Sequence, residues 1–393
     1  MTIGINGYEA VISRFGYDLK TGLPRRVGSG EYCFELLINL NKIDKKNKYI
    51  IYLPQNPTYD LPKESSNWHY RIVKPKKMWT LVGLSLEFLL RRSKPDVFLS
   101  PTHYLPIFSP RRSVISILDV SYIRFPELFK KSDLNQLTKW TSYSVKKAKG
   151  VFTISKSSKD DIIKEYRIPG YKIAVTYPGI RKETNDKKPA SPRLSARLAR
   201  GEHEISMKDL EQKYRIKGNY ILFVGTLQPR KNIIRLIEAF SRLKNDPELV
   251  IIGKKGWLYE DILEAPRKFS VEDRVKFLDF IPNSELPAFY KNAICFVLPS
   301  LYEGFGLPVL EAMRYGCPVI VSNVSSLPEV GGDAVLYVDP LSADDIAKKL
   351  ELLVGDEDLR KKLIKKGYEQ VKKFSWEKTA KDTLNALVKI ANE

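Results

Sequence analysis

The chain has 393 residues, of which 43% are hydrophobic and 28% are charged. This length exceeds what one ordinary hydrophobic core holds, so it favours two α/β domains, and the composition excludes a disordered or fibrous protein. No apolar run approaches the length of a membrane span, and residues 1–6 lack the basic and apolar regions of a signal peptide. We therefore expect a cytoplasmic protein with no membrane-spanning segment.

The net charge of +20 is distributed unevenly along the chain. Residues 1–180 hold 30 lysines and arginines against 15 acidic residues, and residues 181–217 hold 11 against 6, whereas residues 218–393 hold 25 of each. A basic first half indicates either an anionic partner or a surface that favours solubility. The candidate partners are an anionic membrane surface, a polyprenyl-phosphate acceptor and a nucleic acid. The last is the weakest, because the first half has no identifiable nucleic-acid-binding module.

The first half of the chain alternates apolar runs with helical patterns. Strands are predicted at residues 3–6, 49–53, 97–100, 114–118, 151–155 and 174–177. This alternation is typical of a parallel sheet of the Rossmann type, whose ligands bind at the carboxyl ends of the strands. By this rule Asp119, which directly follows one of these strands, faces a ligand site, as do Ser155 and the turn at Pro178-Gly179.

Two further segments of the first half allow two interpretations each. Gly28, Ser29 and Gly30 lie between the first strand and the first helix, and they form either a phosphate-binding loop or a tight turn with close helix packing. Residues 78–90 form a largely apolar helix with basic residues at both ends. Such a helix either packs on the sheet or lies in a membrane interface.

Residues 181–217 are rich in lysine, arginine and proline, and they predict a connector with a mobile loop and a short helix at residues 207–214. A second α/β series follows, with strands predicted at residues 220–225, 249–253, 275–278, 293–299, 319–322 and 334–338. The pattern is helical from Leu341 to the end of the chain. Four regions result: 1–180, 181–217, 218–372 and 373–393.

Residues 293–313 predict a strand, a glycine loop and a helix, and the rest of the second half is organised around them. Gly304 and Gly306 let the loop backbone approach a ligand, and the helix that follows presents free N–H groups that suit a phosphate. Glu303 lies in the loop and Glu311 in the predicted first turn of the helix. Their spacing does not require them to face each other, so we expect each to accept hydrogen bonds from ligand hydroxyls. Phosphate and hydroxyls together indicate a nucleotide sugar.

Arg230 and Lys231 form the most prominent basic pair of the neutral half. They follow a predicted strand and precede a helix, where two cations can hold a diphosphate and offset the charge of a departing nucleotide. The alternative is a solvent-facing pair in a loop. With these cations present, a divalent metal is not expected.

Other signals of a metal or redox site are weak. The three cysteines lie in apolar settings typical of buried reduced thiols, and no cysteine–histidine cluster has the spacing of a zinc site. Asp356-Glu357-Asp358 is similar to the acidic motif of metal-dependent sugar transferases, but acids at this predicted helix start complement the helix dipole. We expect no metal and no cofactor.

Taken together, the chain resembles the retaining glycosyltransferases of family 4, which have the GT-B fold of two Rossmann-like parallel-sheet domains facing a central cleft. The resemblance covers nearly the whole chain and is strongest at residues 220–339. Its main carriers are residues 225–232 (GTLQPRKN), Glu303 with Glu311 at a Glu-x7-Glu spacing, and residues 374–377 (FSWE).

The resemblance implies a role for each of these residues. Arg230 and Lys231 bind the donor diphosphate. Glu303 and the backbone of Phe305 and Gly306, with Leu307 beside them, contact the donor sugar, and Glu311 holds the ribose. The loop from Gly28 to Gly30 closes on the phosphates, the first domain binds the acceptor, and residues 373–393 cross back to that domain.

One position departs from the family pattern. Many relatives have His-Asp at the end of the strand that here reads Leu118-Asp119, so the contact of that histidine near the sugar is missing. His103 follows the preceding strand and is either a partial substitute or a structural loop residue. We place Asp119 and His103 among the candidate catalytic residues, together with Arg230, Lys231 and Glu303.

The sequence therefore predicts transfer of a hexose, with mannose from GDP-mannose favoured by family frequency, to a hydroxyl of a glycan or lipid-linked saccharide. The protein is expected to be cytoplasmic, with an alternative location at the inner face of the membrane. The alternatives are a catalytically silent nucleotide-sugar-binding scaffold and a relative of the GT-B phosphorylases or synthases.

Overall fold

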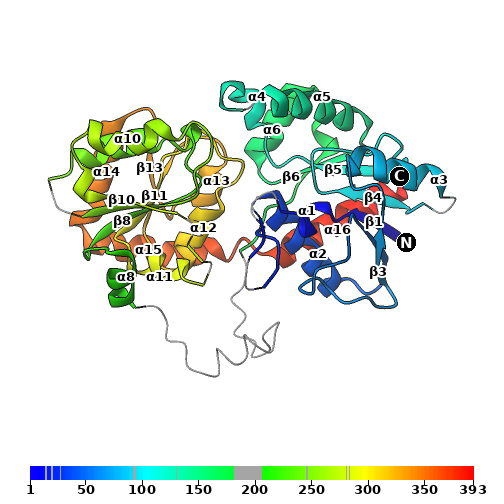
Figure 1. Cartoon of the computed structure of the whole chain (residues 1–393), viewed down its shortest axis with the longest axis horizontal. Coiled ribbons are helices and arrows are strands. Elements are labelled where there is room, and N and C mark those ends of the chain that lie inside the picture. Colours follow the sequence, from blue (N-terminus) through cyan, green and yellow to red (C-terminus); the bar gives the residue numbers. More distant parts are fainter. Residues whose placement is uncertain are drawn as a thin grey trace. The chain divides into compact units, whose positions relative to one another are not determined.

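The computed structural model describes residues 1–13, 16–18, 21–26, 28–91, 94–129, 131–180, 206–244, 247–279, 281–282 and 284–393. The chain divides into two compact units (Figure 1). Unit 1 consists of Met1–Arg181 with Phe374–Glu393, and unit 2 consists of Lys182–Lys373. The loop that the sequence predicts to be mobile, within residues 181–205, lies outside the described residues.

Unit 1 contains, in its described part, a seven-stranded parallel sheet in the order β3-β2-β1-β4-β5-β6-β7. Its strands are β1 (Thr2–Asn6), β2 (Lys48–Leu53), β3 (Trp68–Ile72), β4 (Val97–Ser100), β5 (Ser113–Ser116), β6 (Gly150–Thr153) and β7 (Ile173–Val175). Its α-helices are α1 (Tyr8–Val11), α2 (Ser29–Ile43), α3 (Leu84–Leu90), α4 (Ser121–Arg124), α5 (Lys131–Lys147), α6 (Lys156–Tyr166) and α16 (Trp376–Asn392). The central strands β4, β5 and β6 are buried along their whole length, as expected for a parallel sheet covered on both faces.

Three details of unit 1 differ from the sequence predictions. Strand β3 is not predicted, because its pattern of one buried residue and four partly or fully exposed residues lacks an apolar run. The apolar segment 78–90 is not one α-helix, since it begins with a π-helical turn at Trp79–Gly83 and continues as α3. Strand β5 ends at Ser116, so Asp119 lies three residues beyond its end.

Helix α16 packs within unit 1, against α2 and β4. Its N-cap, Ser375, accepts a hydrogen bond from the backbone N–H of Lys378 at 3.2 Å. Trp376 lies beside Tyr32 of α2, with ring centroids 6.0 Å apart. The segment before the connector passes so close to this helix start that a Cβ on Gly179 would lie 1.9 Å from the backbone nitrogen of Trp376. Only glycine fits there.

Unit 2 contains, among the residues described, a six-stranded parallel sheet in the order β10-β9-β8-β11-β12-β13. Its strands are β8 (Tyr220–Val224), β9 (Glu248–Ile252), β10 (Val275–Leu278), β11 (Cys295–Leu298), β12 (Val319–Ser322) and β13 (Leu336–Val338). Its α-helices are α8 (Met207–Tyr214), α9 (Ile233–Ser241), α10 (Glu260–Lys268), α11 (Leu286–Asn292), α12 (Leu307–Arg314), α13 (Leu327–Gly331), α14 (Ala343–Gly355) and α15 (Glu357–Val371). The predicted α/β class with two parallel sheets is thereby confirmed.

Two helices of unit 2 can be compared with the sequence predictions for residues 207–214 and 356–358. Helix α8 has the bounds predicted for the connector helix, but it packs against α11, with the rings of Tyr214 and Phe289 5.1 Å apart. Asp356 is the N-cap of α15, where its carboxylate accepts a hydrogen bond from the backbone N–H of Leu359 at 2.8 Å. The acidic residues 356–358 therefore begin a helix, as the sequence analysis favours.

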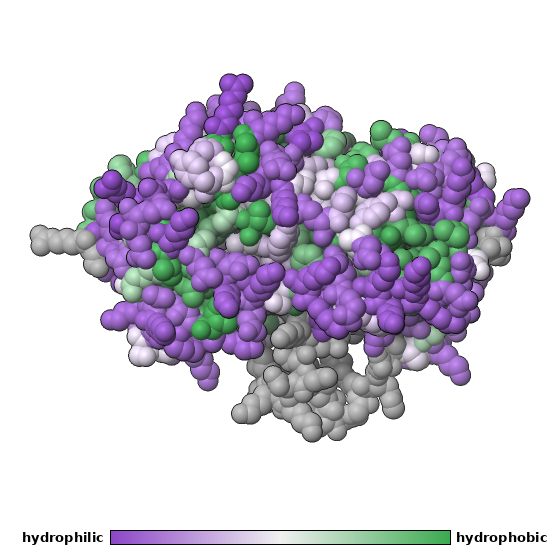
Figure 2. Space-filling view, turned by 180° about the vertical axis from the view of Figure 1, so that it is seen from behind, coloured by the Kyte–Doolittle hydropathy of each residue, from purple (hydrophilic) through white to green (hydrophobic). Residues whose placement is uncertain are grey.

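The surface is mainly hydrophilic on the face drawn in Figure 2, with hydrophobic side chains gathered in small areas. Among the residues that the structure describes, no helix combines the length and the apolar character needed to cross a membrane. The three cysteines are all buried as free thiols.

Candidate active site

The candidate donor site lies at the carboxyl ends of the neighbouring strands β8 and β11 of unit 2. These strands are adjacent in the sheet although β9 and β10 separate them along the chain. The chain after β8 forms a 3-10 turn at Pro229–Lys231 before α9, and the chain after β11 forms the glycine loop before α12. The topology thus brings the two most informative motifs of the sequence to one edge of the sheet.

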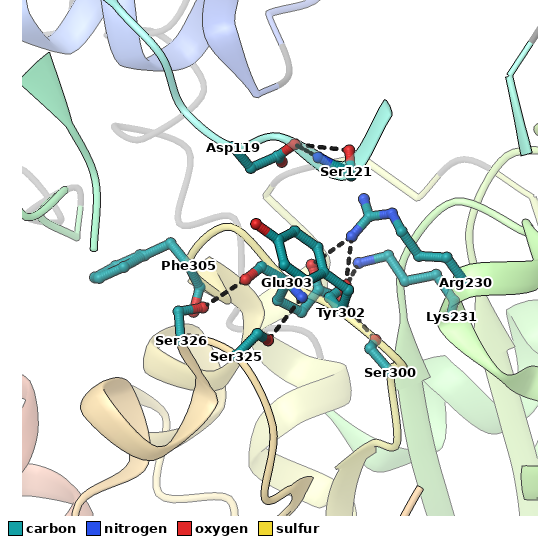
Figure 3. A network of polar contacts seen from close by, with 10 residues as sticks. All are labelled: Asp119, Ser121, Arg230, Lys231, Ser300, Tyr302, Glu303, Phe305, Ser325 and Ser326. Carbon is teal, nitrogen blue, oxygen red and sulfur yellow. Dashed lines mark hydrogen bonds and ion pairs between the residues drawn. The ribbon is translucent and has the colours of Figure 1, made fainter. Parts of the chain in front are cut away.

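Glu303 is the centre of this site (Figure 3). One carboxylate oxygen, Oε1, accepts hydrogen bonds from Lys231 Nζ at 2.5 Å and from Ser300 Oγ at 2.7 Å. The other, Oε2, accepts one from an Arg230 guanidinium nitrogen at 3.1 Å. The Glu303 and Lys231 side chains are only 8% and 10% exposed, so these ion pairs lie largely out of solvent.

The surroundings of Glu303 keep its carboxyl ionised. Burial alone would raise its pKa, but the charges of Lys231 and Arg230, together with hydrogen bonds from Lys231 and Ser300, lower the pKa to about 2. A carboxylate has about four acceptor positions, of which the Lys231, Ser300 and Arg230 bonds use three. Glu303 is therefore an ionised acceptor with capacity for a further donor, such as a sugar hydroxyl.

Backbone contacts hold the two loops together. The backbone N–H of Leu301 donates to the carbonyl oxygen of Arg230 at 2.9 Å, and the Arg230 side chain donates to the carbonyl oxygen of Tyr302 at 2.7 Å. Asn232, in the left-handed conformation with φ of 60°, donates to the carbonyl oxygens of Pro299 and Pro340 at 2.9 and 2.7 Å. One side chain thus links the segments that follow β8, β11 and β13.

Two serines after β12 hold the glycine loop from its other side. Ser325 Oγ accepts a hydrogen bond from the Glu303 backbone N–H at 2.9 Å. Ser326 Oγ donates to the carbonyl oxygens of Glu303 and Phe305 at 2.8 and 2.9 Å. The loop ends at Gly306, the N-cap of α12, whose φ of 105° is open to glycine alone among the common residues. The start of α12, at Leu307, thus has the free backbone N–H groups of a helix N-terminus, which suit an anion.

Glu311 has a different environment from Glu303. It is the fifth residue of α12 and lies in the second turn, so its predicted place in the first turn is wrong. The hydroxyl of Tyr290 donates to its carboxylate at 3.0 Å, and Tyr290 itself is fully buried. Burial raises the pKa of Glu311, although the Tyr290 hydrogen bond and the charge of Arg314 oppose this shift. A partly buried carboxylate with a raised pKa makes Glu311 a candidate for a functional position.

The candidate residues of unit 1 follow the neighbouring strands β4 and β5. The Asp119 carboxylate accepts hydrogen bonds from the backbone N–H and the hydroxyl of Ser121, at 2.9 and 2.6 Å, at the start of α4 (Figure 3). The His103 ring lies edge-on to Tyr122, with centroids 5.8 Å apart and an interplanar angle of 68°. Asp119 and His103 thus both lie near α4, since Tyr122 belongs to that helix.

The predicted loop at Gly28–Gly30 begins α2. Gly28 is the N-cap with a φ of 56°, and the Ser29 hydroxyl donates to the carboxylate of Glu9 at 3.1 Å. A Cβ on Gly30 would lie 3.1 Å from the carbonyl oxygen of Glu9, so close packing accounts for this glycine. Arg26, just before the loop, forms an ion pair with Asp60 at 2.5 Å and is a structural anchor.

Sequence reasoning named the candidate ligand-binding residues but missed most of the residues that hold them in place. Tyr290, Ser325 and Ser326 were not predicted, and Asn232 and Ser300 were seen only as parts of their motifs. The one available signal was the pair of polar residues Ser325-Ser326 just beyond an apolar strand, at the edge where ligands bind. In the described part of the chain, no group of three or more His, Cys, Asp or Glu side chains is arranged to hold a metal ion.

The fold of two parallel α/β sheets, with a cationic pair and a glycine loop at the carboxyl edge of one sheet, is that of the GT-B glycosyltransferases. Solved structures of glycosyltransferases have the same fold as this chain. Sucrose-phosphate synthase from Thermosynechococcus elongatus matches with a TM-score of 0.69 at 17% identity, over 98% of each chain. WaaG, a glycosyltransferase involved in lipopolysaccharide biosynthesis, matches with a TM-score of 0.67 at 16% identity, over 98% of this chain and 99% of WaaG.

Comparison of sequences identifies the family. The model of the glycosyl transferases group 1 matches residues 206–370. The O-antigen chain mannosyltransferase B of Escherichia coli is 33% identical over 322 residues, which cover 81% of this chain and 78% of that protein. The O-antigen chain mannosyltransferase RfbU of Salmonella typhimurium is 30% identical over 65% of this chain and 64% of its own length. The chain belongs to the glycosyl transferases group 1 family, and it is an enzyme, a glycosyltransferase.

Proposed function

We propose that the chain transfers mannose from GDP-mannose to a hydroxyl of a glycan or lipid-linked saccharide, with retention of the anomeric configuration. The observation that carries the proposal is the Arg230–Glu303–Lys231 cluster at the carboxyl edge of the unit 2 sheet. It combines two cations for a diphosphate with an ionised acceptor for a sugar hydroxyl. Glu311, in the second turn of α12, is the expected acceptor for the ribose hydroxyls.

The cluster stabilises the leaving group in this proposal. As the nucleoside diphosphate departs, negative charge grows on its phosphate oxygens, and fixed cations in a poorly solvated site offset that charge. Arg230 and Lys231 are held in place by Glu303 before any ligand binds, so little reorganisation is needed. Because these cations supply the charge, we expect no divalent metal requirement.

The sugar, the nucleotide base and the acceptor in this proposal are inferred from the relatives. Two relatives are described as O-antigen chain mannosyltransferases, which favours mannose and hence GDP-mannose. A further relative, at 27% identity over 80% of this chain and 80% of its own length, transfers N-acetylgalactosamine to a diphospho-undecaprenol-linked saccharide in Campylobacter jejuni. A lipid-linked or polymeric saccharide acceptor therefore fits the class.

The proposed reaction is a displacement on one face of the sugar. The acceptor oxygen forms a bond to C1 as the bond from C1 to the phosphate oxygen breaks. The acceptor proton passes to the departing phosphate oxygen, so the products are the glycoside and GDP. In this scheme the chain positions the reactants and stabilises charge, and it contributes no covalent nucleophile.

A transfer assay with the purified chain tests the proposal. GDP-mannose, UDP-glucose and UDP-N-acetylgalactosamine are each offered with mannose-terminated oligosaccharides, and the release of the nucleoside diphosphate is measured together with the anomeric NMR signal of the product. The proposal predicts transfer from GDP-mannose and an α-linked product. A β-linked product contradicts retention, transfer from a UDP-sugar alone contradicts the donor, and saturable binding without turnover favours the silent scaffold.

A further inference from the structure

Unit 1 has a basic cavity at the amino ends of its central strands. The cavity has a volume of about 340 Å³, which lies within the range of small-molecule sites, about 300–1,000 Å³. The described residues that line it are Lys94, Pro95, Asp96, Pro110, Arg111, Arg112, Lys149 and Glu393. Four of these eight side chains are cations, and cations gathered in a hollow attract an anionic ligand.

The sheet topology brings these cations together from segments that are far apart in the sequence. Arg111 and Arg112 precede β5. Lys94 precedes β4, and Lys149 precedes β6. Because β4, β5 and β6 are neighbours in a parallel sheet, their amino ends meet at one edge. Asp119 follows β5, so the cavity and the candidate site residue of unit 1 lie at opposite edges of the sheet.

Backbone hydrogen bonds hold the segments that carry the cations. The backbone N–H of Phe98 donates to the carbonyl oxygen of Arg112 at 2.9 Å. The backbone N–H of Lys149 donates to the carbonyl oxygen of Ser113 at 2.8 Å. The walls of the cavity are thus tied to the sheet, and a ligand that binds there need not pay for ordering a loop.

The two acidic side chains of the cavity are already engaged. The Asp96 carboxylate accepts a hydrogen bond from the backbone N–H of Thr2 at 2.7 Å. Glu393 forms an ion pair with Lys149 at 3.7 Å. Each acid therefore has a partner of its own, and one of the four cations is paired.

The other three cations of the cavity have no such partner among the described residues. Lys94, Arg111 and Arg112 form neither an ion pair nor a side-chain hydrogen bond in that part of the chain. Lys94 and Arg111 are exposed, and Arg112 is half-buried. Three like charges around one hollow repel one another, and an anion placed between them removes this repulsion. A guanidinium carries its N–H donors in a rigid fork that matches the oxygens of a phosphate.

We propose that this cavity is an anion site, separate from the candidate donor site of unit 2, that binds a diphosphate group through Arg111, Arg112 and Lys94. Two guanidinium forks and one ammonium group suit the several oxygens of a diphosphate better than the two oxygens of a single carboxylate. No described residue of the lining is aromatic, so a nucleobase has no ring on which to stack. The group recognised is therefore the diphosphate, either as the free anion or as part of a nucleotide. The inference goes beyond the proposed transfer reaction and uses none of its residues.

Isothermal titration with inorganic diphosphate tests the inference. The arginine double variant, Arg111→Ala/Arg112→Ala, is expected to bind diphosphate in the cavity about 30-fold more weakly or worse, because hydrogen bonds between charged groups are the strong ones. The lysine double variant, Lys76→Ala/Lys77→Ala, is the charge-matched control. It removes two adjacent exposed cations of the same unit that do not line the cavity, and it should bind like the intact chain. Binding should weaken with salt.

The donor site is also proposed to bind a diphosphate, so the titrations are designed to separate two classes of site. The intact chain should show both classes. The arginine double variant should lose the cavity class and keep its affinity for GDP-mannose, whereas Lys231→Ala should keep the cavity class. Glu393→Gln releases Lys149 from its ion pair and should tighten the cavity class about threefold. GDP, titrated in the same way, distinguishes a nucleotide from the free anion as the source of the diphosphate.

Three results would overturn the inference. They are titration curves of the intact chain and the arginine double variant that coincide, a loss with the lysine double variant as large as with the arginine one, and an unchanged affinity of Glu393→Gln. The last result applies even if the arginine double variant unfolds more easily than the intact chain. Retention of both classes by Lys231→Ala would contradict only the proposed donor site, so the two proposals fail or stand separately.

Discussion

Glu303 is the residue on which the charge of the donor site depends. Its single negative charge offsets part of the charge of Arg230 and Lys231, and in the proposed function an incoming diphosphate shares these two cations with it. The cluster therefore carries a counterion that reduces the buried positive charge, and it keeps a net positive charge that favours an anionic ligand. The same carboxylate remains ionised, with its pKa lowered to about 2, and in the proposed function it accepts a hydrogen bond from a sugar hydroxyl.

The pKa of Glu303 predicts how stability depends on pH. A carboxyl whose pKa falls from 4.5 in the unfolded chain to about 2 in the folded protein contributes stability above pH 4.5, and this contribution is lost as the pH falls toward 2. The free energy of unfolding of the intact chain should therefore fall more steeply from pH 5 to pH 2 than that of Glu303→Gln. Urea unfolding at several pH values measures both slopes, and equal slopes would contradict the charge assignment.

Unlike Glu303, Glu311 is expected to lower the stability of the protein while contributing to donor binding. Burial raises its pKa, so its ionised form opposes folding at neutral pH. Glu311→Gln should leave the free energy of unfolding unchanged or increase it. The same change should weaken GDP-mannose binding about 10- to 100-fold, because a hydrogen bond to a charged acceptor contributes about 1.5–3 kcal/mol. Calorimetric titration measures the affinity. If Glu311→Gln binds the donor as tightly as the intact chain, Glu311 does not belong to the donor site.

At the scale of elements, the glycine loop is shaped by the segment that follows β12. Ser326 is fully buried and its hydroxyl holds the carbonyl oxygens of Glu303 and Phe305. Ser326→Ala leaves two carbonyl oxygens without this donor, so it should lower the free energy of unfolding by about 1–3 kcal/mol. It should also raise the KM for the donor more than it lowers kcat, because the loop proposed to contact the sugar becomes less ordered.

Ser241→Ala provides the control for this loop variant. Ser241 also donates to a backbone carbonyl, that of Glu238 at 2.8 Å, but it lies at the end of α9 away from the loop. It should leave the KM for the donor unchanged. Steady-state kinetics measures the KM of both variants. An equal rise in KM for the two would contradict the role of Ser326 in positioning the glycine loop.

These elements show what a sequence can and cannot reveal. The strand-loop-helix pattern at residues 293–313 was predictable because Gly306 and the apolar run of β11 are local signals. The contact of Glu303 with Lys231 was not, since it depends on β8 and β11 being neighbours in the sheet order. Likewise Tyr290 approaches Glu311 from a separate helix, and a tyrosine within an apolar helix has no sequence signal for such a role. Strand β3 was missed because its residues are only partly buried.

At the scale of the whole molecule, the two halves of the chain differ in net charge. The basic excess lies in the first half of the chain, whereas residues 218–393, which contain the Arg230–Glu303–Lys231 cluster, have balanced charges. In the proposed function, this division would let unit 1 meet an anionic partner or surface while unit 2 binds the nucleotide sugar. Attraction to such a surface would therefore act mainly on unit 1.

The proposed charge stabilisation by Arg230 and Lys231 predicts that transfer needs no added metal. Rates of mannose transfer measured with EDTA, and with added Mg²⁺ or Mn²⁺, should agree within about twofold, because the diphosphate charge is offset by the two side chains. Loss of activity in EDTA that is restored by a divalent ion would assign the diphosphate to a metal and contradict this role for the pair.

The affinity for GDP-mannose tests the central claim most directly. Isothermal titration should give saturable binding by the intact chain and about 100-fold weaker binding by Lys231→Ala, which removes a charged hydrogen-bond donor and leaves Glu303 facing the diphosphate. Lys213→Ala breaks a surface ion pair with Glu285, 2.7 Å long, in the same unit and should bind like the intact chain. Equal affinities of the intact chain and Lys231→Ala, both folded, would contradict the assignment of the donor site.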